Sequence, residues 1–253
     1  VGWGVAGPVS GYLVGLTSLR VAFYVSFALL LVCAGIAVQM PVRRVSLSAH
    51  VGQGLRLVAT SWRWAVFLTV MFIAGAALAI SFNYLFLYLA ELNASSTWMG
   101  LSLTLATLSE MAVMFYAAQL LTRWGTRTLL MASLLFMALR LLGYAATGSA
   151  AVVIALQLLH GPSFGLMWVA AVARADQLAP PGMSATAQGL NSGVTMGLGA
   201  AFGSITGGFV YQSVGLASMF GWAGAAVLVA LILFVVAGWV AAQQKLKATA
   251  GEA

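Results

Sequence analysis

The chain has little charge of either sign, and this scarcity already sets its class. Its 253 residues include eleven Lys and Arg and four Asp and Glu, so 6% are charged, whereas 62% are hydrophobic. A soluble domain carries about 25% charged residues. The chain therefore lacks the charge to cover a water-exposed surface, which excludes a soluble enzyme, a nucleic-acid-binding domain and a disordered tail. The composition predicts a protein embedded in a lipid bilayer.

Cysteine is nearly absent as well. The single cysteine, Cys33, lies inside an apolar run. One cysteine cannot form a disulfide within the chain, and no metal-ligand spacing is present. We therefore expect neither a metal site nor a cofactor, and interpret Cys33 as a small buried hydrophobic residue.

Long apolar runs are what the sequence has in abundance. A transmembrane helix needs about 20 apolar residues, and eight stretches are of about that length. They run roughly 1–18, 20–40, 63–90, 98–121, 127–147, 150–173, 185–213 and 216–240. The runs are continuously apolar rather than alternating, which argues against a transmembrane barrel. The predicted fold class is an all-α, polytopic membrane bundle of about eight helices.

The basic residues predict the orientation of these helices. Nine of the eleven follow even-numbered helices: Arg43, Arg44, Arg56, Arg63, Arg123, Arg127, Arg174, Lys245 and Lys247. The opposite side has only Arg20, and Arg140 lies within an apolar run. Because cytoplasmic loops carry the excess of Lys and Arg, we expect the even connections and the tail 241–253 to be cytoplasmic. The protein would then be a multi-pass protein of the cell membrane.

A weak internal repeat predicts the domain organisation. At an offset of 197 residues Gly2 matches Gly199, and Phe23 matches Phe220. Copies in one orientation, six helices apart, are typical of a parallel repeat in transporters. We expect 63–240 to form a complete six-helix half, 1–40 to be the last two helices of a preceding half, and 41–62 to be a central cytoplasmic loop. The four further helices of that first half are an expected partner of the chain.

Three ionisable residues lie within predicted transmembrane helices. Glu110, Arg140 and His160 stand on three consecutive helices, at depths that can share one level of the bilayer. Intramembrane ionisable groups are costly, and they usually mark substrate or proton pathways. A carboxyl and an imidazole can each exchange a proton, so we interpret the three as a site for proton coupling and substrate binding. Either Glu110 or His160 could carry the proton. The alternative is a buried ion pair that only holds helices together.

Polar residues near these three extend the predicted cavity. The sequence Gly161-Pro162 predicts a kink directly after His160. Residues that could line the cavity are Asn83, Tyr84, Gln157, Gln188 and Asn191. Each has the alternative role of an interhelical hydrogen bond. The spacing Gly199-x3-Gly203-x3-Gly207 predicts close helix packing within the bundle.

On these residues the chain resembles the major facilitator superfamily, in the branch of lactose permease and the phenylpropionate transporter. Segment 118–127 is similar to the short cytoplasmic loop motif of the superfamily, with Arg123, Gly125 and Arg127 in place and Thr122 where an Asp is usual. Glu110, Arg140 and His160 fall on the branch's glutamate, arginine and histidine of its helices 8, 9 and 10. The resemblance implies a proton symporter working by alternating access.

The resemblance also bears on the substrate. Trp3 falls where the lactose permease stacks a tryptophan on a sugar ring, which implies a sugar or glycoside. Other positions depart from that protein: Ser163 replaces an acidic residue, Gln157 replaces a lysine, and the helix-7 aspartates have no counterpart from Ser81 to Tyr84. These neutral positions resemble the phenylpropionate relatives, so an aromatic acid stays open.

Two other functional classes compete with transport. A membrane sensor or scaffold that keeps the fold without the transport cycle would tolerate the loss of charged pairs. An intramembrane enzyme is disfavoured, because the sequence has no paired intramembrane aspartates, no His-Glu-x-x-His run and no Ser/His pair with nucleophile spacing. The leading prediction is a transporter that binds a small organic solute and a proton, with no nucleic-acid partner.

Overall fold

A computed structural model describes residues 18–39 and 61–251. Contacts divide the chain into two units, Val1–Ala49 and His50–Ala253, and each is described by itself. Trp3, the predicted helix 1–18 and nearly all of the predicted loop 41–62 lie outside the described residues. The first unit contributes one described helix, α2 (Leu19–Gln39), which is apolar along its length and corresponds to the predicted helix 20–40.

The second unit is helical throughout its described part, residues 61–251, which contains no strand. This confirms the all-α fold class. Its elements are α4 (Trp62–Glu91), α5 (Ser96–Phe115), α6 (Ala117–Ala146), α7 (Ala150–Ala155), η2 (Leu156–Leu159), η3 (Gly161–Gly165), α8 (Leu166–Leu178), α9 (Ser184–Ser192), η4 (Gly193–Gly199) and α10 (Ala200–Gly251). Of these, η2 is a 3-10 turn, and η3 and η4 are π-helical turns.

Five helical stretches of the described residues are long and apolar enough to cross a membrane. They are Trp62–Glu91, Ser96–Phe115, Ala117–Ala146, Ala150–Leu178 and Ser184–Gln244. The predicted count of eight therefore stays a prediction. The helix expected over 98–121 has an irregularity at Tyr116 (φ −93°, ψ 7°), which divides it between α5 and α6.

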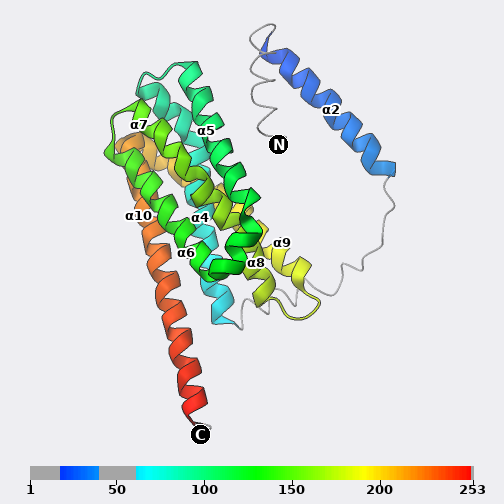
Figure 1. The fold of residues 1–253 in the computed structure, drawn as a ribbon. Coiled ribbons are helices and arrows are strands. Elements are labelled where there is room, and N and C mark those ends of the chain that lie inside the picture. Colours follow the sequence, from blue (N-terminus) through cyan, green and yellow to red (C-terminus); the bar gives the residue numbers. More distant parts are fainter. Residues whose placement is uncertain (1–17, 40–60, 252–253) are drawn as a thin grey trace. The chain divides into compact units, whose positions relative to one another are not determined.

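Two glycines mark points where the chain reverses inside a continuous helical stretch. Gly125 in α6 and Gly215 in α10 have positive φ values of 72° and 81°, a conformation that favours glycine. Before Gly215, α10 packs along α4; after it, Phe220 meets Tyr144 edge-on, and Arg127 donates to the Val235 carbonyl near the other end of α6. Figure 1 shows α9 and the C-terminus at the same end of the bundle. The reversal at Gly215 separates the predicted helices 185–213 and 216–240.

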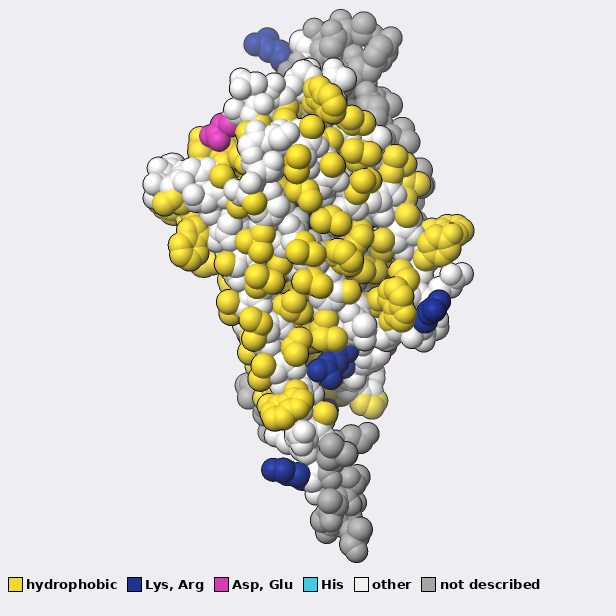
Figure 2. Space-filling view, turned by 60° about the vertical axis from the view of Figure 1, so that its left-hand side comes forward, with side chains coloured by type: hydrophobic (Ala, Val, Ile, Leu, Met, Phe, Trp, Pro, Cys, Tyr) yellow, Lys and Arg dark blue, Asp and Glu magenta, His cyan; other side chains and the backbone are white. Residues whose placement is uncertain are grey.

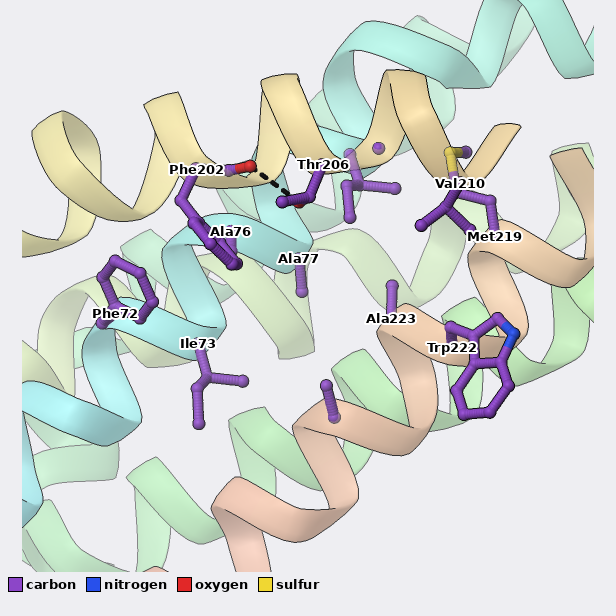
Figure 3. A pocket seen from close by; sticks show the side chains of 13 residues that line it. Phe72, Ile73, Ala76, Ala77, Phe202, Thr206, Val210, Met219, Trp222 and Ala223 are labelled. Carbon is purple, nitrogen blue, oxygen red and sulfur yellow. Dashed lines mark hydrogen bonds between the residues drawn. The ribbon is translucent and has the colours of Figure 1, made fainter. Parts of the chain in front are cut away.

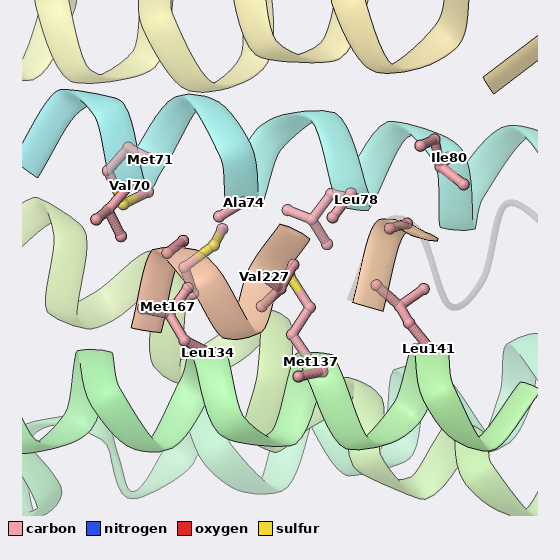
Figure 4. Close-up of a cluster of buried hydrophobic side chains, with 14 of the residues drawn as sticks. Val70, Met71, Ala74, Leu78, Ile80, Leu134, Met137, Leu141, Met167 and Val227 are labelled. Atoms are coloured by element: carbon pink, nitrogen blue, oxygen red, sulfur yellow. The ribbon is translucent and has the colours of Figure 1, made fainter. Parts of the chain in front are cut away.

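The hydrophobic core lies between α4, α6, α8 and the part of α10 that follows Gly215. We call this part the second arm of α10, and the part before Gly215 the first arm. Figure 4 shows its interdigitated side chains, among them Met71 and Leu78 of α4, Leu134 and Met137 of α6, and Val227 of α10. The four residues other than Leu78 are 1% exposed or less. α10 packs against both α4 and α6, and α4 is the most buried of the five membrane-length stretches.

Small residues let α4 approach the chain that precedes Gly215. A side-chain carbon on Gly199 would meet the Phe72 carbonyl oxygen at 2.6 Å, and one on Gly203 would collide with the backbone of Ala76. The predicted glycine seam therefore packs against α4 inside the unit. This confirms intramolecular packing as its role.

The basic residues gather near one end of the bundle. The Trp64 indole donates to the Leu178 carbonyl oxygen, and the Thr126 hydroxyl donates to the Gln177 side chain, both at 2.9 Å. These contacts bring the start of α4, the turn in α6 and the end of α8 together. Figure 2 shows apolar side chains over the middle of this face and most of its basic side chains towards the end that carries the C-terminus. The structure thus agrees with the predicted clustering of charge, while the membrane side it faces stays a prediction.

Candidate functional site

Glu110, Arg140 and His160 meet within the bundle, as the sequence predicts. Glu110 lies on α5, Arg140 on α6, and His160 at the junction of η2 and η3. His160 Nε2 is 3.6 Å from Glu110 Oε2, and Arg140 Nη1 is 2.5 Å from His160 Nδ1. Arg140 is 1% exposed, whereas the Glu110 side chain is 32% exposed. Only the carboxylate of this pair of opposite charges is therefore open to a solute.

The imidazole of His160 links the two charges, and its contacts fix its tautomer. A guanidinium has donors and no acceptor, so Arg140 Nη1 donates and His160 Nδ1 accepts. In the neutral ring the proton then resides on Nε2, which faces the Glu110 carboxylate. Protonation at Nδ1 would displace Arg140 from its acceptor. The contact with Arg140 thus occupies the nitrogen at which His160 would take up a second proton.

Arg140 has hydrogen-bond partners on two sides of the bundle. Its Nη2 donates to the Ser81 hydroxyl of α4 at 3.3 Å, while its Nη1 contacts His160. A buried guanidinium requires hydrogen bonds and a nearby counter-charge. Glu110 supplies that counter-charge through the imidazole. A series of contacts that runs from Glu110 through His160 and Arg140 to Ser81 thus joins α5 to α4 through the bundle interior.

Local helix irregularity places His160 in this position. The helical hydrogen-bonding pattern changes at Gly161-Pro162, from a 3-10 turn to a π turn at His160, while the predicted kink stays a prediction. The Gly161 amide donates to the Ser109 hydroxyl at 2.8 Å. A side-chain carbon on Gly161 would collide with the Ser109 carbonyl group. The absence of that carbon lets α5 approach closely, and Glu110 is the residue that follows Ser109.

Aromatic side chains surround the imidazole. Phe164 stacks on the His160 ring with 5.3 Å between centroids, and Phe82 of α4 meets it edge-on at 5.7 Å. Trp168 continues the row beyond Phe164 at 6.1 Å. Phe82 and Trp168 are exposed, and Phe164 is half-buried. The site therefore combines an accessible carboxylate with accessible aromatic faces.

The other residues predicted to line a cavity do not join this cluster. The Asn83 side chain donates to the hydroxyl of Ser204 in α10, and the Tyr84 hydroxyl donates to the Ser204 carbonyl oxygen, both at 2.8 Å. Gln188 of α9 donates to the Val172 carbonyl oxygen, and buried Asn191 lies beside Thr195. These are interhelical or local contacts, which is the alternative role. Gln157 is buried next to the site, and Ser163 donates to the His160 carbonyl oxygen.

The loop motif lies at the end of the bundle opposite the α4–α5 connection. Its glycine, Gly125, makes the reversal in α6, and its two arginines are exposed. Arg127 donates to the Val235 carbonyl oxygen at 3.4 Å, so it contacts the second arm of α10. Thr122, which replaces the usual Asp, donates to backbone carbonyls of its own helix.

A cavity lies away from the ionisable residues. It has a volume of about 190 Å³ and lies between α4 and the two arms of α10. Figure 3 shows Ile73 and Ala77 of α4, Phe202 and Thr206 of the first arm, and Trp222 of the second arm around it. The lining is almost entirely apolar, and it includes none of the residues predicted from sequence for the site. Within residues 18–39 and 61–251 no cluster of His, Cys, Asp and Glu could hold a metal ion.

Sequence reasoning missed two residues of the cluster, Ser81 and Phe82. They directly precede Asn83 and Tyr84, the pair that the sequence favours because a polar residue is conspicuous in an apolar run. In an α-helix, neighbouring residues point about 100° apart, so only one pair could face His160. Nothing in the apolar run around these four residues indicates which face that is. The useful signal is chemical: a buried arginine needs more acceptors than one histidine provides.

Comparisons with known proteins agree with this fold. The MFS_1 like family matches residues 1–222. The maltose permease of Geobacillus stearothermophilus is 30% identical over 213 residues, which is 84% of this chain and 54% of that protein. An uncharacterized transporter of Bacillus subtilis, YwbF, is 24% identical over 87% of this chain and 55% of its own length. The chain thus spans about half the length of these bacterial relatives.

A solved structure shows the same arrangement of helices. The nucleoside transporter NupG matches with a TM-score of 0.71 and 18% identity, over 92% of this chain and 63% of that chain.

The human major facilitator superfamily domain-containing protein 6-like is 30% identical over 64% of this chain and 27% of its own length. The chain belongs to the MFS_1-like family of the major facilitator superfamily.

Proposed function

We propose that the protein is a proton-coupled secondary transporter of a small, neutral, ring-shaped solute rich in hydroxyl groups, such as a sugar or glycoside. Residues 63–240 would form one six-helix half of the alternating-access machine. One observation carries the proposal. The carboxylate of Glu110 is accessible beside aromatic rings, while the cation of the site, Arg140, is buried behind His160.

This arrangement favours a neutral solute over an aromatic acid. A carboxylate accepts hydrogen bonds from hydroxyl groups, and Phe82 and Trp168 offer flat apolar faces to the ring of a sugar. An anionic solute would meet Glu110 first and could not reach Arg140, which is 1% exposed. The relative with a named solute is a maltose permease, and maltose is a neutral sugar. The aromatic acid that the sequence left open becomes the second candidate.

Glu110 is assigned as the proton carrier. Unprotonated, it faces His160 Nε2–H and balances Arg140 through the imidazole. A proton on Glu110 releases this contact and gives the carboxyl a donor for a solute hydroxyl. Proton binding and solute binding then share one group. This sharing is the physical basis for coupling, because a free-energy coupling between two ligands requires that each changes the affinity for the other.

The test is uptake by the full-length protein in proteoliposomes, with labelled maltose and labelled 3-phenylpropionate as probes. We expect maltose accumulation driven by a pH gradient, and its loss in Glu110→Gln, while counterflow of maltose without a gradient persists. Accumulation with unchanged pH dependence in Glu110→Gln would remove Glu110 as the carrier. Counterflow of 3-phenylpropionate and not of maltose would overturn the substrate class. No counterflow of either would favour a scaffold or sensor over a transporter of these classes.

Orientation is a separate part of the proposal. The basic residues at the end of the bundle near the C-terminus would face the cytoplasm under the positive-inside rule. The test is protease accessibility of a tag at the C-terminus in right-side-out vesicles. Protection until the vesicles are opened supports a cytoplasmic tail, and cleavage in intact vesicles contradicts it.

A further inference from the structure

Three buried polar atoms beside the site have no hydrogen-bond partner among the described residues. They are Arg140 Nε, the Tyr144 hydroxyl and Gln157 Nε2. The three residues are 1%, 0% and 2% exposed. Buried polar groups in proteins are almost always hydrogen-bonded, to protein or to ordered water. Three such atoms in one place therefore point to a bound group that completes their hydrogen bonds.

These atoms are neighbours. Tyr144 follows Arg140 by four residues on α6, so the two share a face of the helix. The Tyr144 hydroxyl lies beside the side chains of Gln157 and Ser81 and near the Arg140 guanidinium. These contacts do not have the geometry of direct hydrogen bonds. Buried polar groups that face one another without a direct hydrogen bond are commonly bridged by water.

The chemistry of the set identifies the ligand. Arg140 Nε and Gln157 Nε2 can only donate, whereas the hydroxyls of Tyr144 and Ser81 can donate or accept. A water molecule accepts two hydrogen bonds and donates two, so it satisfies both kinds of partner. Buried waters typically make about three hydrogen bonds to otherwise unsatisfied groups. The set offers that number.

We propose that Arg140, Tyr144, Gln157 and Ser81 form a buried water-binding site, and that Tyr144 and Gln157 are positioning residues for Arg140. The bound water holds Arg140 Nε while Nη1 donates to His160. The guanidinium is thereby kept directed at the imidazole. The water site stands on the geometry alone, and only its effect on transport rests on the proposed function.

The chain contains a matched control in Tyr88. It is 3% exposed, and its hydroxyl lies 2.9 Å from the carbonyl oxygen of Tyr144 and 2.7 Å from that of Thr147. The hydroxyl of Tyr88 is therefore satisfied by protein, close to Tyr144 along the same helix pair. Two buried tyrosines thus differ in whether protein alone satisfies their hydroxyl.

The first experiment is X-ray radiolytic labelling of the purified full-length protein in ¹⁸O water, read by mass spectrometry. Radicals formed from a bound water modify the side chains it touches, even where bulk solvent does not reach. We expect Tyr144 to be labelled several-fold faster than Tyr88. Equal, low labelling of both tyrosines would overturn the water site, whether or not the protein transports.

The second experiment compares Tyr144→Phe with Tyr88→Phe by thermal denaturation in detergent. Loss of a hydroxyl that only lacks a partner is neutral or stabilising, whereas loss of a group that holds water lowers the midpoint. We expect both variants to have lowered midpoints. An unchanged or raised midpoint for Tyr144→Phe alone would contradict the proposal. A midpoint of the unmodified protein that rises in chloride relative to gluconate would assign the site to a halide ion instead.

The positioning role is read from transport. We expect Tyr144→Phe and Gln157→Leu to shift the pH dependence of maltose uptake, because a less constrained Arg140 changes the balance between His160 and Glu110. Tyr88→Phe is expected to leave the pH profile in place. An unshifted profile in both site variants would leave no positioning role, even with the water site confirmed by labelling.

Discussion

Helices α4 and α5 follow each other in the chain and are both apolar, yet they have different roles. In the most apolar part of α4 67% of the residues are buried within the structure, and in that of α5 only 11% are. The packing helix contributes Ser81 and Phe82 to the site, whereas the exposed helix contributes its carboxylate, Glu110. The unit thus keeps the titratable acid of the site on a helix that contributes little to the core. Substitutions should divide accordingly into those that unfold the bundle and those that change transport.

The largest difference is expected for phenylalanine truncation. Phe67 of α4 is 1% exposed, and Phe115 of α5 is 81% exposed. Phe67→Ala leaves a cavity in the core and should destabilise by roughly 3 kcal/mol. Phe115→Ala should stay within about 0.5 kcal/mol of the unmodified protein. Denaturation in mixed detergent micelles measures both, and similar losses would show that α5 contributes as much to packing as α4 does.

Glycine replacement sharpens the same comparison. A side-chain carbon on Gly75 of α4 would collide with the Thr195 backbone, whereas one on Gly100 of α5 meets nothing within 4 Å. Gly75→Ala forces α4 away from η4 and should cost about 2 kcal/mol. Gly100→Ala should stabilise the helix by about 0.5–1 kcal/mol, since alanine replaces glycine in a helix interior. Thermal midpoints that shift in opposite directions are the expected result, and a drop for both would break the contrast.

Two serine substitutions test hydrogen bonds of the site, and their expected effects on stability are smaller. Ser81 of α4 accepts from Arg140, and Ser109 of α5 accepts from the Gly161 amide. Each alanine variant should lose about 1 kcal/mol, the usual contribution of one hydrogen bond. Because Ser81 contacts the guanidinium, Ser81→Ala should also alter the pH profile of uptake. An unaltered profile would mean that α4 supports Arg140 without tuning it.

A small stability effect is expected where the functional effect is largest. Glu110 is 32% exposed, and its oxygen is 3.6 Å from the imidazole, so the contact is long and partly solvated. Glu110→Gln should change the unfolding free energy by less than about 1 kcal/mol. Gradient-driven uptake should nevertheless be lost. A strongly destabilised Glu110→Gln would turn the residue into a structural partner of His160 and weaken the comparison of the two helices.

The class of the protein and its three ionisable residues were predictable from the sequence for a clear physical reason. Charge is so costly in a bilayer that Glu110, Arg140 and His160 stand out against their surroundings, and Gly161-Pro162 disrupts helical hydrogen bonding wherever it occurs. The faces of the helices were harder to predict. α4 is apolar on all sides, so periodicity does not separate the side that meets α6 from the side that bears Phe82. For the same reason Asn83 and Tyr84 could not be assigned to Ser204 rather than to the cavity.

Boundaries inside long helical stretches were predictable only in part. The irregularity at Tyr116 involves no glycine or proline, so no residue type indicates it. The reversals at Gly125 and Gly215 fall in the gaps that the sequence predicts between 98–121 and 127–147 and between 185–213 and 216–240.

The helix that carries His160 has a winding that changes twice within ten residues. The 3-10 turn Leu156–Leu159 is overwound relative to an α-helix, and the π turn Gly161–Gly165 is underwound. The two deviations have opposite sense, so the twist gained in the first is largely returned in the second. The outer parts, α7 and α8, can keep their registry with α6 while the segment between them is rotated. His160 stands at the junction of the two turns, where this rotation relative to a regular α-helix is greatest.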